Sequence, residues 1–196
     1  AGGGARGGAV AGVQGRLAAG FGGVVVFGPW VGATAGLGLA AAGEFSGPLV
    51  LLSPGFSRED ASKFPRTLDR LASVLGHLPF AVMLKLIGPA MKGSLPPDRR
   101  DALVAELQKN DPRFVRRQTH SYLEYLDRHG SLAPRLCDSR VRAWVVFGER
   151  DDVGLRGDER GVLEECSNVT LVTILDAGHF TLNEKPGEIA ELVLAA

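Results

Sequence analysis

The hydrophobic pattern places short apolar runs near both ends of the chain and helical repeats between them. Residues 24–27, 48–53, 141–147 and 169–175 are short, apolar and mostly β-branched, which is typical of buried strands in a parallel sheet. We expect the run 169–175 to be buried on both faces. Residues 33–42 form a helical pattern, and after Pro186 the apolar residues Ile189, Leu192 and Val193 recur at helical spacing. The alternation predicts an α/β fold with about four parallel strands and flanking helices.

Residues 57–135 differ from both ends because their helical patterns are interrupted by several prolines. One predicted helix face contains Leu68, Leu71, Ala72 and Leu75, and a later helix is expected to end at Gly130. The chain therefore divides into a weakly structured Gly/Ala-rich segment at 1–23, an α/β core at 24–56 and 136–196, and a helical insert at 57–135.

Residues 17–43 contain no charged side chain, which leaves two interpretations open. The length would allow a membrane-spanning helix. The alternative is a strand at 24–27, a sharp glycine-containing turn at 28–32 and a helix that packs against the sheet. An apolar strand follows at 48–53, as a strand-helix-strand unit requires. We therefore favour the sheet and expect no membrane segment.

Composition narrows the classes of function. The 196 residues, 45% of them hydrophobic, can form one core, and 22 basic residues balance 22 acidic ones. This balance gives no electrostatic reason to expect nucleic acid as a partner. Cys137 and Cys166 stand alone, so we expect two free thiols in a reducing cytoplasm and neither a metal site nor a cofactor.

The remaining histidines and several arginines carry no motif. We interpret His77, His120 and His129 as surface or core residues, and the arginines at 99, 100, 113, 116 and 117 as a solvated face.

Two predicted loops carry candidate catalytic residues. The sequence GERD at 148–151 follows one predicted strand and ends at Asp151, and LDAGHF at 175–180 follows the last strand and contains His179. Loops at the carboxyl ends of neighbouring parallel strands lie at the same edge of a sheet. We therefore predict that the Asp151 carboxylate contacts the His179 ring and holds it in one tautomer, ready to act as a base.

These turns, together with EKP at 184–186, resemble the C-terminal portion of the α/β-hydrolase family, in particular a member with a helical lid. In that family the catalytic acid follows the penultimate strand and the histidine follows the last one. The resemblance implies that 57–135 forms a lid over a pocket for a small-molecule substrate. It also implies a hydrolase of the Ser-His-Asp type that acts on an ester or a similar compound without a cofactor or metal.

The nucleophile departs from the family pattern. The family's G-x-S-x-G turn corresponds to GPWVG at 28–32, which places Trp30 at the nucleophile position. Indole is not a nucleophile of this kind. GATAG at 32–36 offers Thr34 as a less favoured alternative, since a threonine near a helix start commonly bonds to backbone.

The family's first half, which supplies sheet strands and part of the oxyanion hole, has no counterpart here. We therefore expect an impaired hydrolase, with a non-catalytic binding or interaction protein, or a decayed fragment on the same scaffold, as the alternative. The strand 24–27 would then have an exposed edge, which favours self-association.

Overall fold

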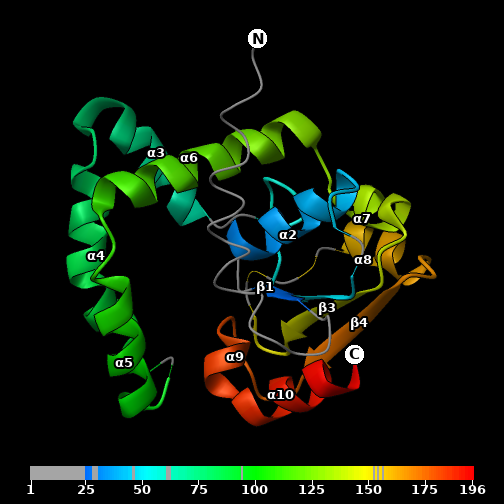
Figure 1. Ribbon diagram of the computed structural model, residues 1–196. Helices are drawn as coiled ribbons and strands as arrows, with labels where there is room; N and C mark the ends of the chain where they lie inside the picture. The colour runs from blue at the N-terminus through cyan, green and yellow to red at the C-terminus, as the bar shows by residue number, and fades with distance from the viewer. Residues whose placement is uncertain are drawn as a thin grey trace.

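The computed structural model describes residues 25–27, 31–45, 47–60, 63–93, 95–151, 153, 155 and 157–196 (Figure 1). The segment 1–23, Trp30 and the turn 28–30 lie outside these residues. The described strands and helices are, in chain order, β1 (Val25–Phe27), α2 (Val31–Ala41), β2 (Leu49–Leu52), α3 (Lys63–Leu75), α4 (Leu78–Ala90), α5 (Pro97–Leu107), α6 (Pro112–His129), α7 (Ala133–Ser139), β3 (Ala143–Gly148), α8 (Gly157–Glu164), β4 (Val169–Ile174), α9 (Thr181–Glu184) and α10 (Pro186–Ala195).

The strands form one parallel sheet in the order β1-β2-β3-β4. In register, Val50 of β2 lies opposite Trp144 of β3, and Val146 of β3 lies opposite Val172 of β4. The prediction of about four parallel strands is confirmed. Among the described strands β1 has only β2 as a neighbour.

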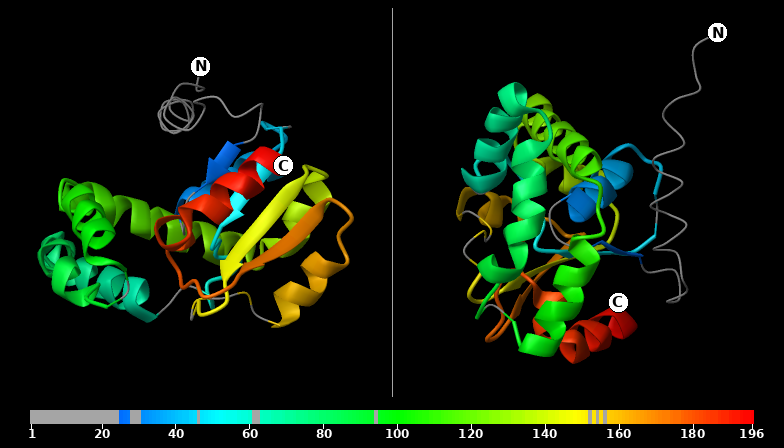
Figure 2. Two further views of the ribbon diagram at one scale, coloured as in Figure 1. Left: turned by 90° about the horizontal axis from the view of Figure 1, so that it is seen from below. Right: turned by 90° about the vertical axis from the view of Figure 1, so that its left-hand side faces the viewer.

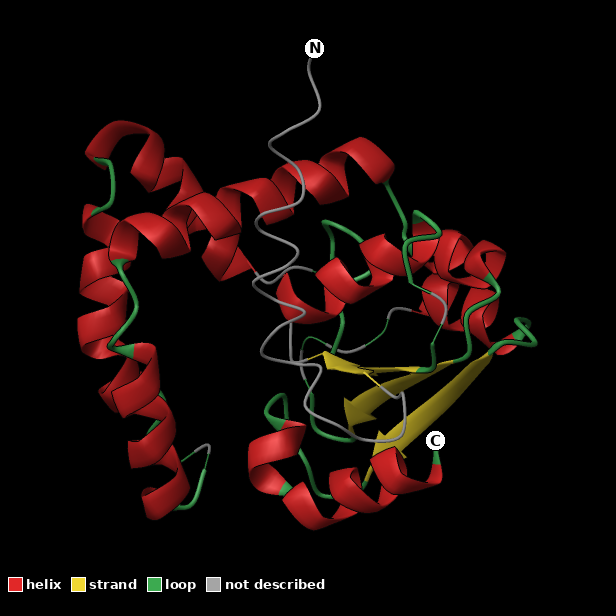
Figure 3. Ribbon diagram, in the orientation of Figure 1, coloured by secondary structure: helices red, strands yellow, loops and turns green. Residues whose placement is uncertain are grey.

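Helices cover the sheet on both faces, as Figure 3 shows. Leu49 and Leu51 of β2 point into a core shared with Leu37 of α2, whereas Val50 and Leu52 pack on the opposite face, where α10 lies. This alternation with a period of two is the property of a strand sandwiched between two layers. The apolar character of the strands thus follows from burial on both sides.

The last strand corrects one expectation. Residues 169–175 were predicted to be buried on both faces, but in β4 only Ile174 is buried, and Thr170 and Thr173 are exposed. Leu175, just after the strand, is 63% exposed. The reason is position, because β4 lies at an edge of the described sheet and the helices cover it only in part.

The helices between β2 and β3 extend away from the sheet before the chain returns to it (Figure 2). Helix α6 is the link, since its C-terminal half buries Tyr122, Leu123 and Leu126 in the core beneath α2. It ends at Gly130, whose φ of 63° is the left-handed conformation that glycine tolerates, as predicted.

The predicted apolar face of α3 is correct for two of its four residues. In α3, Leu68 and Ala72 are buried against Phe80 of α4. Leu71 and Leu75 were assigned to the same face but are 48% and 51% exposed. Helix α3 packs against other helices on one side only. Its apolar face is therefore wider than the surface that those helices cover, and Leu71 and Leu75 remain exposed.

The uncharged stretch 17–43 is not one continuous helix. Its described part consists of strand β1 and helix α2, which has 11 residues. Such a helix is about 16 Å long, against the ~30 Å of a bilayer core. Nowhere in the described ranges is there a helix with the length and apolarity needed to cross a membrane.

The cysteines also differ from expectation. Cys137 at the end of α7 and Cys166 after α8 form a disulfide, with Cα atoms 5.5 Å apart. The two residues are 29 positions apart, and only the packing of α7 against α8 brings them together. The expectation of free thiols is therefore wrong, and the inference of a cytoplasmic location loses the observation on which it rested.

Candidate active site

The predicted pair is present. The ring Nδ1 of His179 lies 3.0 and 3.1 Å from the two carboxylate oxygens of Asp151. The Asp151 side chain has no exposed surface and that of His179 is 15% exposed. Adjacent parallel strands produce this contact, because Asp151 follows β3 and His179 follows β4. A carboxylate at Nδ1 keeps the proton there, which leaves Nε2 as the basic nitrogen of a neutral ring.

The Asp151 carboxylate is stabilised as an anion. Burial alone would raise its pKa, but hydrogen bonds from His179, from the Ser53 side chain and from the backbone N–H of Val153 outweigh burial, so that the pKa lies below its ordinary value. The Val153 nitrogen lies 3.0 Å from Oδ1. Asp151 is therefore charged at neutral pH and can stabilise an imidazolium at His179.

Ser53 is a site residue that the sequence analysis did not identify. It follows β2 directly, is 2% exposed, and its hydroxyl donates to the backbone carbonyl of His179 at 3.2 Å. Its φ of 43° is in the left-handed region, which is uncommon for a residue with a Cβ. The hydroxyl of Ser53 contacts the backbone of His179 and the Asp151 carboxylate, which are the contacts of a residue that positions the pair.

The only sequence signal for Ser53 was its place after a buried strand and before Pro54 and Gly55. The structure adds a reason for the glycine, since a Cβ at Gly55 would overlap the hydroxyl of Tyr122.

The loop that carries His179 is fixed by Glu184. The carboxylate of Glu184 accepts hydrogen bonds from the backbone nitrogens of Gly178 at 2.8 Å and Phe180 at 3.2 Å, on either side of the histidine. Glu184 lies in the short helix α9 that follows the loop. This arrangement leaves little freedom for the ring to leave Asp151.

A second set of bonds joins the two loops. Glu149 accepts from the backbone nitrogen of Asp176 at 3.0 Å, and the backbone nitrogen of Arg150 donates to the carbonyl of Ala177 at 2.8 Å. Gly148 is required at the crossing point, because a Cβ there would overlap the carbonyl oxygens of Ala177 and Gly178. The GERD and AGHF turns therefore form one rigid unit.

The nucleophile candidates are resolved only in part. Trp30 lies outside the described residues. Thr34 lies in α2, is 4% exposed, and its hydroxyl donates to the carbonyl of Gly55 at 3.4 Å. It also contacts the hydroxyl of Tyr122. Burial and the nearby Asp60 carboxylate raise the pKa of that hydroxyl to about 12. These partners favour a structural role for Thr34 over a nucleophilic one.

The other histidines differ in their surroundings. His120 of α6 pairs with Asp69 of α3, its Nδ1 lying 3.1 and 3.2 Å from the carboxylate oxygens. That contact joins residues 51 apart in the chain, so no motif spacing revealed it. His129 lies against Tyr125, with ring centroids 4.5 Å apart. Among the described residues, no group of three or more His, Cys, Asp or Glu side chains is arranged to hold a metal ion.

Comparison with known proteins gives the fold but no sequence relative. No family model and no curated protein matches the sequence. Among solved structures, the chain is similar to MenH from S. aureus, with 18% identity, a TM-score of 0.62, and coverage of 88% of this chain and 66% of that one. The chain is also similar to a thermophilic esterase from Thermogutta terrifontis, with 16% identity, a TM-score of 0.64, and coverage of 94% of this chain and 67% of that one.

A third similar structure is MGS-M2, an α/β-hydrolase enzyme from a deep-sea metagenome library, with 16% identity, a TM-score of 0.57, and coverage of 95% and 68%. The chain therefore has the α/β-hydrolase fold in a partial form, as the resemblance in its sequence implied. It spans about two thirds of the length of the structures that it matches.

Proposed function

We propose that the chain carries the acid–base half of a Ser-His-Asp type site that acts on an ester or a similar small acyl compound. The observation that carries this proposal is the part-buried hydrogen bond between Asp151 and Nδ1 of His179, in a loop whose backbone is bound by Ser53 and Glu184. An α/β fold with a histidine and a carboxylate on the last two strand ends supports acyl transfer more than other reaction classes.

In such a site each residue has a defined part. Nε2 of His179 accepts the proton of an attacking hydroxyl and then donates it to the leaving group. Asp151 keeps the ring in the required tautomer and stabilises the imidazolium that forms. The insert containing α3 to α6 would act as the lid that shapes the substrate pocket, and the substrate would be a small molecule.

The same proposal includes an impairment. Trp30 at the position of the nucleophile could not form an acyl-enzyme, because indole has no nucleophilic hydroxyl or thiol. The alternative from a different class is a binding or interaction protein on the same scaffold, and Trp30 is the residue that favours it, because a bulky indole would fill the place of a reacting carbonyl.

The experiment that tests the acid–base half does not depend on turnover. A proton held between Nδ1 and a carboxylate exchanges slowly and gives a low-field resonance in the proton NMR spectrum. We expect this resonance in the unmodified chain and its loss in both His179→Ala and Asp151→Asn. The His129→Ala variant serves as the control, and a spectrum in which His179→Ala and Asp151→Asn change nothing would contradict the proposal.

A second experiment separates the hydrolase from the binding protein. Trp30→Ser in a fusion with the N-terminal half of a similar esterase should hydrolyse an activated acyl ester, and His179→Ala should abolish this activity. If the folded fusion is inactive, or if its activity survives His179→Ala, the binding alternative is favoured and the acyl-hydrolase proposal fails.

A further inference from the structure

A cavity in the helical insert lies away from the Asp151–His179 pair. It has a volume of about 480 Å³ and lies between α3 and α6. Helix α3 and the turn after it contribute Asp69, Ser73 and His77. Helix α6 contributes His120 and three arginines, Arg113, Arg116 and Arg117. We call this cavity the α3/α6 groove.

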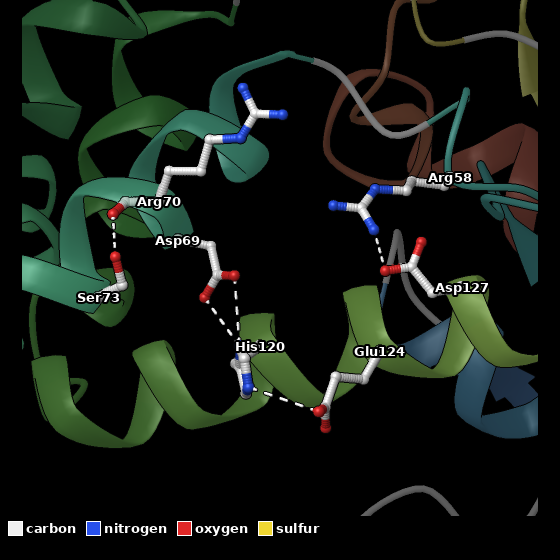
Figure 4. Close-up of polar contacts among 7 residues, drawn as sticks. All are labelled: Arg58, Asp69, Arg70, Ser73, His120, Glu124 and Asp127. Carbon is white, nitrogen blue, oxygen red and sulfur yellow. Dashed lines mark hydrogen bonds and ion pairs between the residues drawn. The ribbon is translucent and has the colours of Figure 1, made fainter.

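The groove has a concentration of positive charge that the neutral chain as a whole lacks. Its three arginines face a single lining carboxylate, that of Asp69. Figure 4 shows that this carboxylate points at the ring of His120, which it contacts at 3.1 and 3.2 Å. Within the described ranges, no carboxylate lies within 4.0 Å of the guanidinium groups of Arg113, Arg116 or Arg117. Arg113 and Arg117 are exposed, as expected of a solvated face, and together with Arg116 they also line one cavity.

The position of the three arginines in α6 also indicates a concentration of positive charge that the helix itself does not need. They occupy the first two turns of the helix, where the backbone dipole favours negative charge, and the one carboxylate at this end is the N-cap Asp111, which accepts from the backbone nitrogen of Arg113 at 2.9 Å. Cations there do not stabilise the helix. Arg116 is partly buried, Arg113 and Arg117 are exposed, and all three line the groove.

We propose that the α3/α6 groove binds a phosphate group that carries two or more negative charges. Guanidinium groups donate paired hydrogen bonds whose geometry matches phosphate oxygens, and three of them exceed what a single carboxylate can accept. His77 adds a further polar side chain to the lining, whereas the hydroxyl of Ser73 donates to the carbonyl of Arg70 at 2.6 Å (Figure 4). The volume suits a small organic phosphate or a lipid headgroup.

The first test uses inorganic pyrophosphate as the probe, titrated into the full chain by calorimetry at constant ionic strength. We expect saturable binding that weakens about tenfold or more when Arg113, Arg116 and Arg117 are all changed to Gln. The control for the change of charge is Lys109→Gln with Arg160→Gln, which removes two exposed cations outside the groove, and it is compared with Arg113→Gln with Arg117→Gln, which removes two inside it.

Unfolding curves verify that the variants remain folded, since exposed substitutions rarely change the free energy of unfolding by more than about 0.5 kcal/mol. The His179→Ala variant should bind pyrophosphate as the native chain does, so that this test and the proposed acyl-hydrolase function can fail separately. Absence of saturable binding, or equal affinity in the native chain and the arginine variant, would overturn the proposal.

The second test distinguishes the source of the phosphate. Sedimentation with vesicles of phosphatidylcholine, with and without phosphatidic acid, is compared in the presence and absence of pyrophosphate. One outcome is that the chain sediments with the phosphatidic acid vesicles, and that pyrophosphate abolishes this binding and the arginine substitutions also abolish it. This result assigns the groove to a lipid phosphate. Binding of pyrophosphate without vesicle binding assigns it to a small phosphorylated compound. Vesicle binding that the arginine substitutions leave unchanged would contradict the groove as the site.

Discussion

The hydroxyl of Ser53 donates to the carbonyl of His179 at 3.2 Å, although 126 positions separate the two residues in the chain. Ser53 follows β2 and His179 follows β4, and β3 with the Asp151 loop lies between them. The bond therefore fastens three strand ends together. The single hydroxyl proton of Ser53 also interacts with the Asp151 carboxylate, and this interaction contributes to the lowered pKa of that carboxyl.

We predict that Ser53→Ala lowers the free energy of unfolding by about 1–3 kcal/mol, because the His179 carbonyl loses the Ser53 hydroxyl that it shares with the Asp151 carboxylate. Urea unfolding at neutral pH measures this change. Ser167→Ala is the control, since Ser167 is exposed. If both variants have the same free energy of unfolding, the Ser53 bonds do not stabilise the site.

The acid side of the stability curve gives a second readout for the same variant. The lowered pKa of Asp151 stabilises the folded chain above the ordinary pKa of the carboxyl, and this contribution is lost as the pH falls through the folded value. With one donor fewer, Ser53→Ala should lose less stability between neutral and acidic pH than the native chain does.

The contact between Asp151 and His179 was predictable because it depends only on strand order and on loops that follow adjacent strands. Ser53 and Glu184 could not be assigned these roles, since a serine after a strand or a glutamate near a helix start has many possible partners. Long-range packing decides which one it meets. The same reason hid the pairing of Asp69 with His120.

The errors about burial also have a physical origin. Apolar periodicity shows which residues can be buried, but the neighbours decide which are. Thr170 and Thr173 are exposed because β4 lies at an edge, and Leu71 and Leu75 are exposed because α3 has packing partners on only one side. Cys137 and Cys166 show the converse, because two isolated cysteines become a pair through helix packing.

A buried pair of carboxyl groups gives the next prediction. Asp60 is 7% exposed and Glu159 is 4% exposed, and Asp60 accepts hydrogen bonds from the backbone nitrogens of Phe56 and Ser57 at 3.1 and 2.9 Å. Burial and the neighbouring Asp60 raise the pKa of Glu159 to about 8. The folded chain therefore retains a proton on Glu159 that the unfolded chain releases near its ordinary pKa of 4.5.

Because the folded state binds more protons in this range, stability is highest below the ordinary pKa of Glu159 and falls as the pH rises towards the folded value. Glu159→Gln cannot ionise and can still donate to Asp60, so its free energy of unfolding should fall less between pH 5 and pH 8 (roughly the window between the two pKa values). Urea unfolding at both pH values measures this difference. Parallel losses in the native chain, in Glu159→Gln and in the exposed control Glu164→Gln would refute the assignment.

The disulfide predicts a dependence on reductant. Reduction of Cys137–Cys166 frees a loop spanning 29 positions, for which chain entropy predicts a loss of about 3–4 kcal/mol in the free energy of unfolding. Unfolding with and without dithiothreitol measures it, and Cys137→Ser with Cys166→Ser should resemble the reduced chain in both conditions. Thiol titration of the purified, unreduced chain after denaturation should detect no free thiol. Two reactive thiols in that sample would show that the pair is not formed.

The edge of the sheet predicts self-association. β1 pairs only with β2 among the described strands, and we propose that its other edge forms backbone hydrogen bonds with another chain. We expect light scattering to show a particle mass that rises with protein concentration. A single monomeric species over a wide range of concentrations would contradict this proposal.

Hydrolysis of an activated acyl ester by the unmodified chain tests the central claim most directly. Removing a triad nucleophile lowers turnover on the order of a million-fold, and a missing oxyanion donor lowers it by roughly a further 10²–10³. We therefore predict no hydrolysis above the buffer rate by these 196 residues, and none after Trp30→Ser alone, on the proposal that they do not include an oxyanion loop. Turnover by the unmodified chain that both Thr34→Ala and His179→Ala abolish would contradict the account, because it would identify Thr34 as the nucleophile of a working triad.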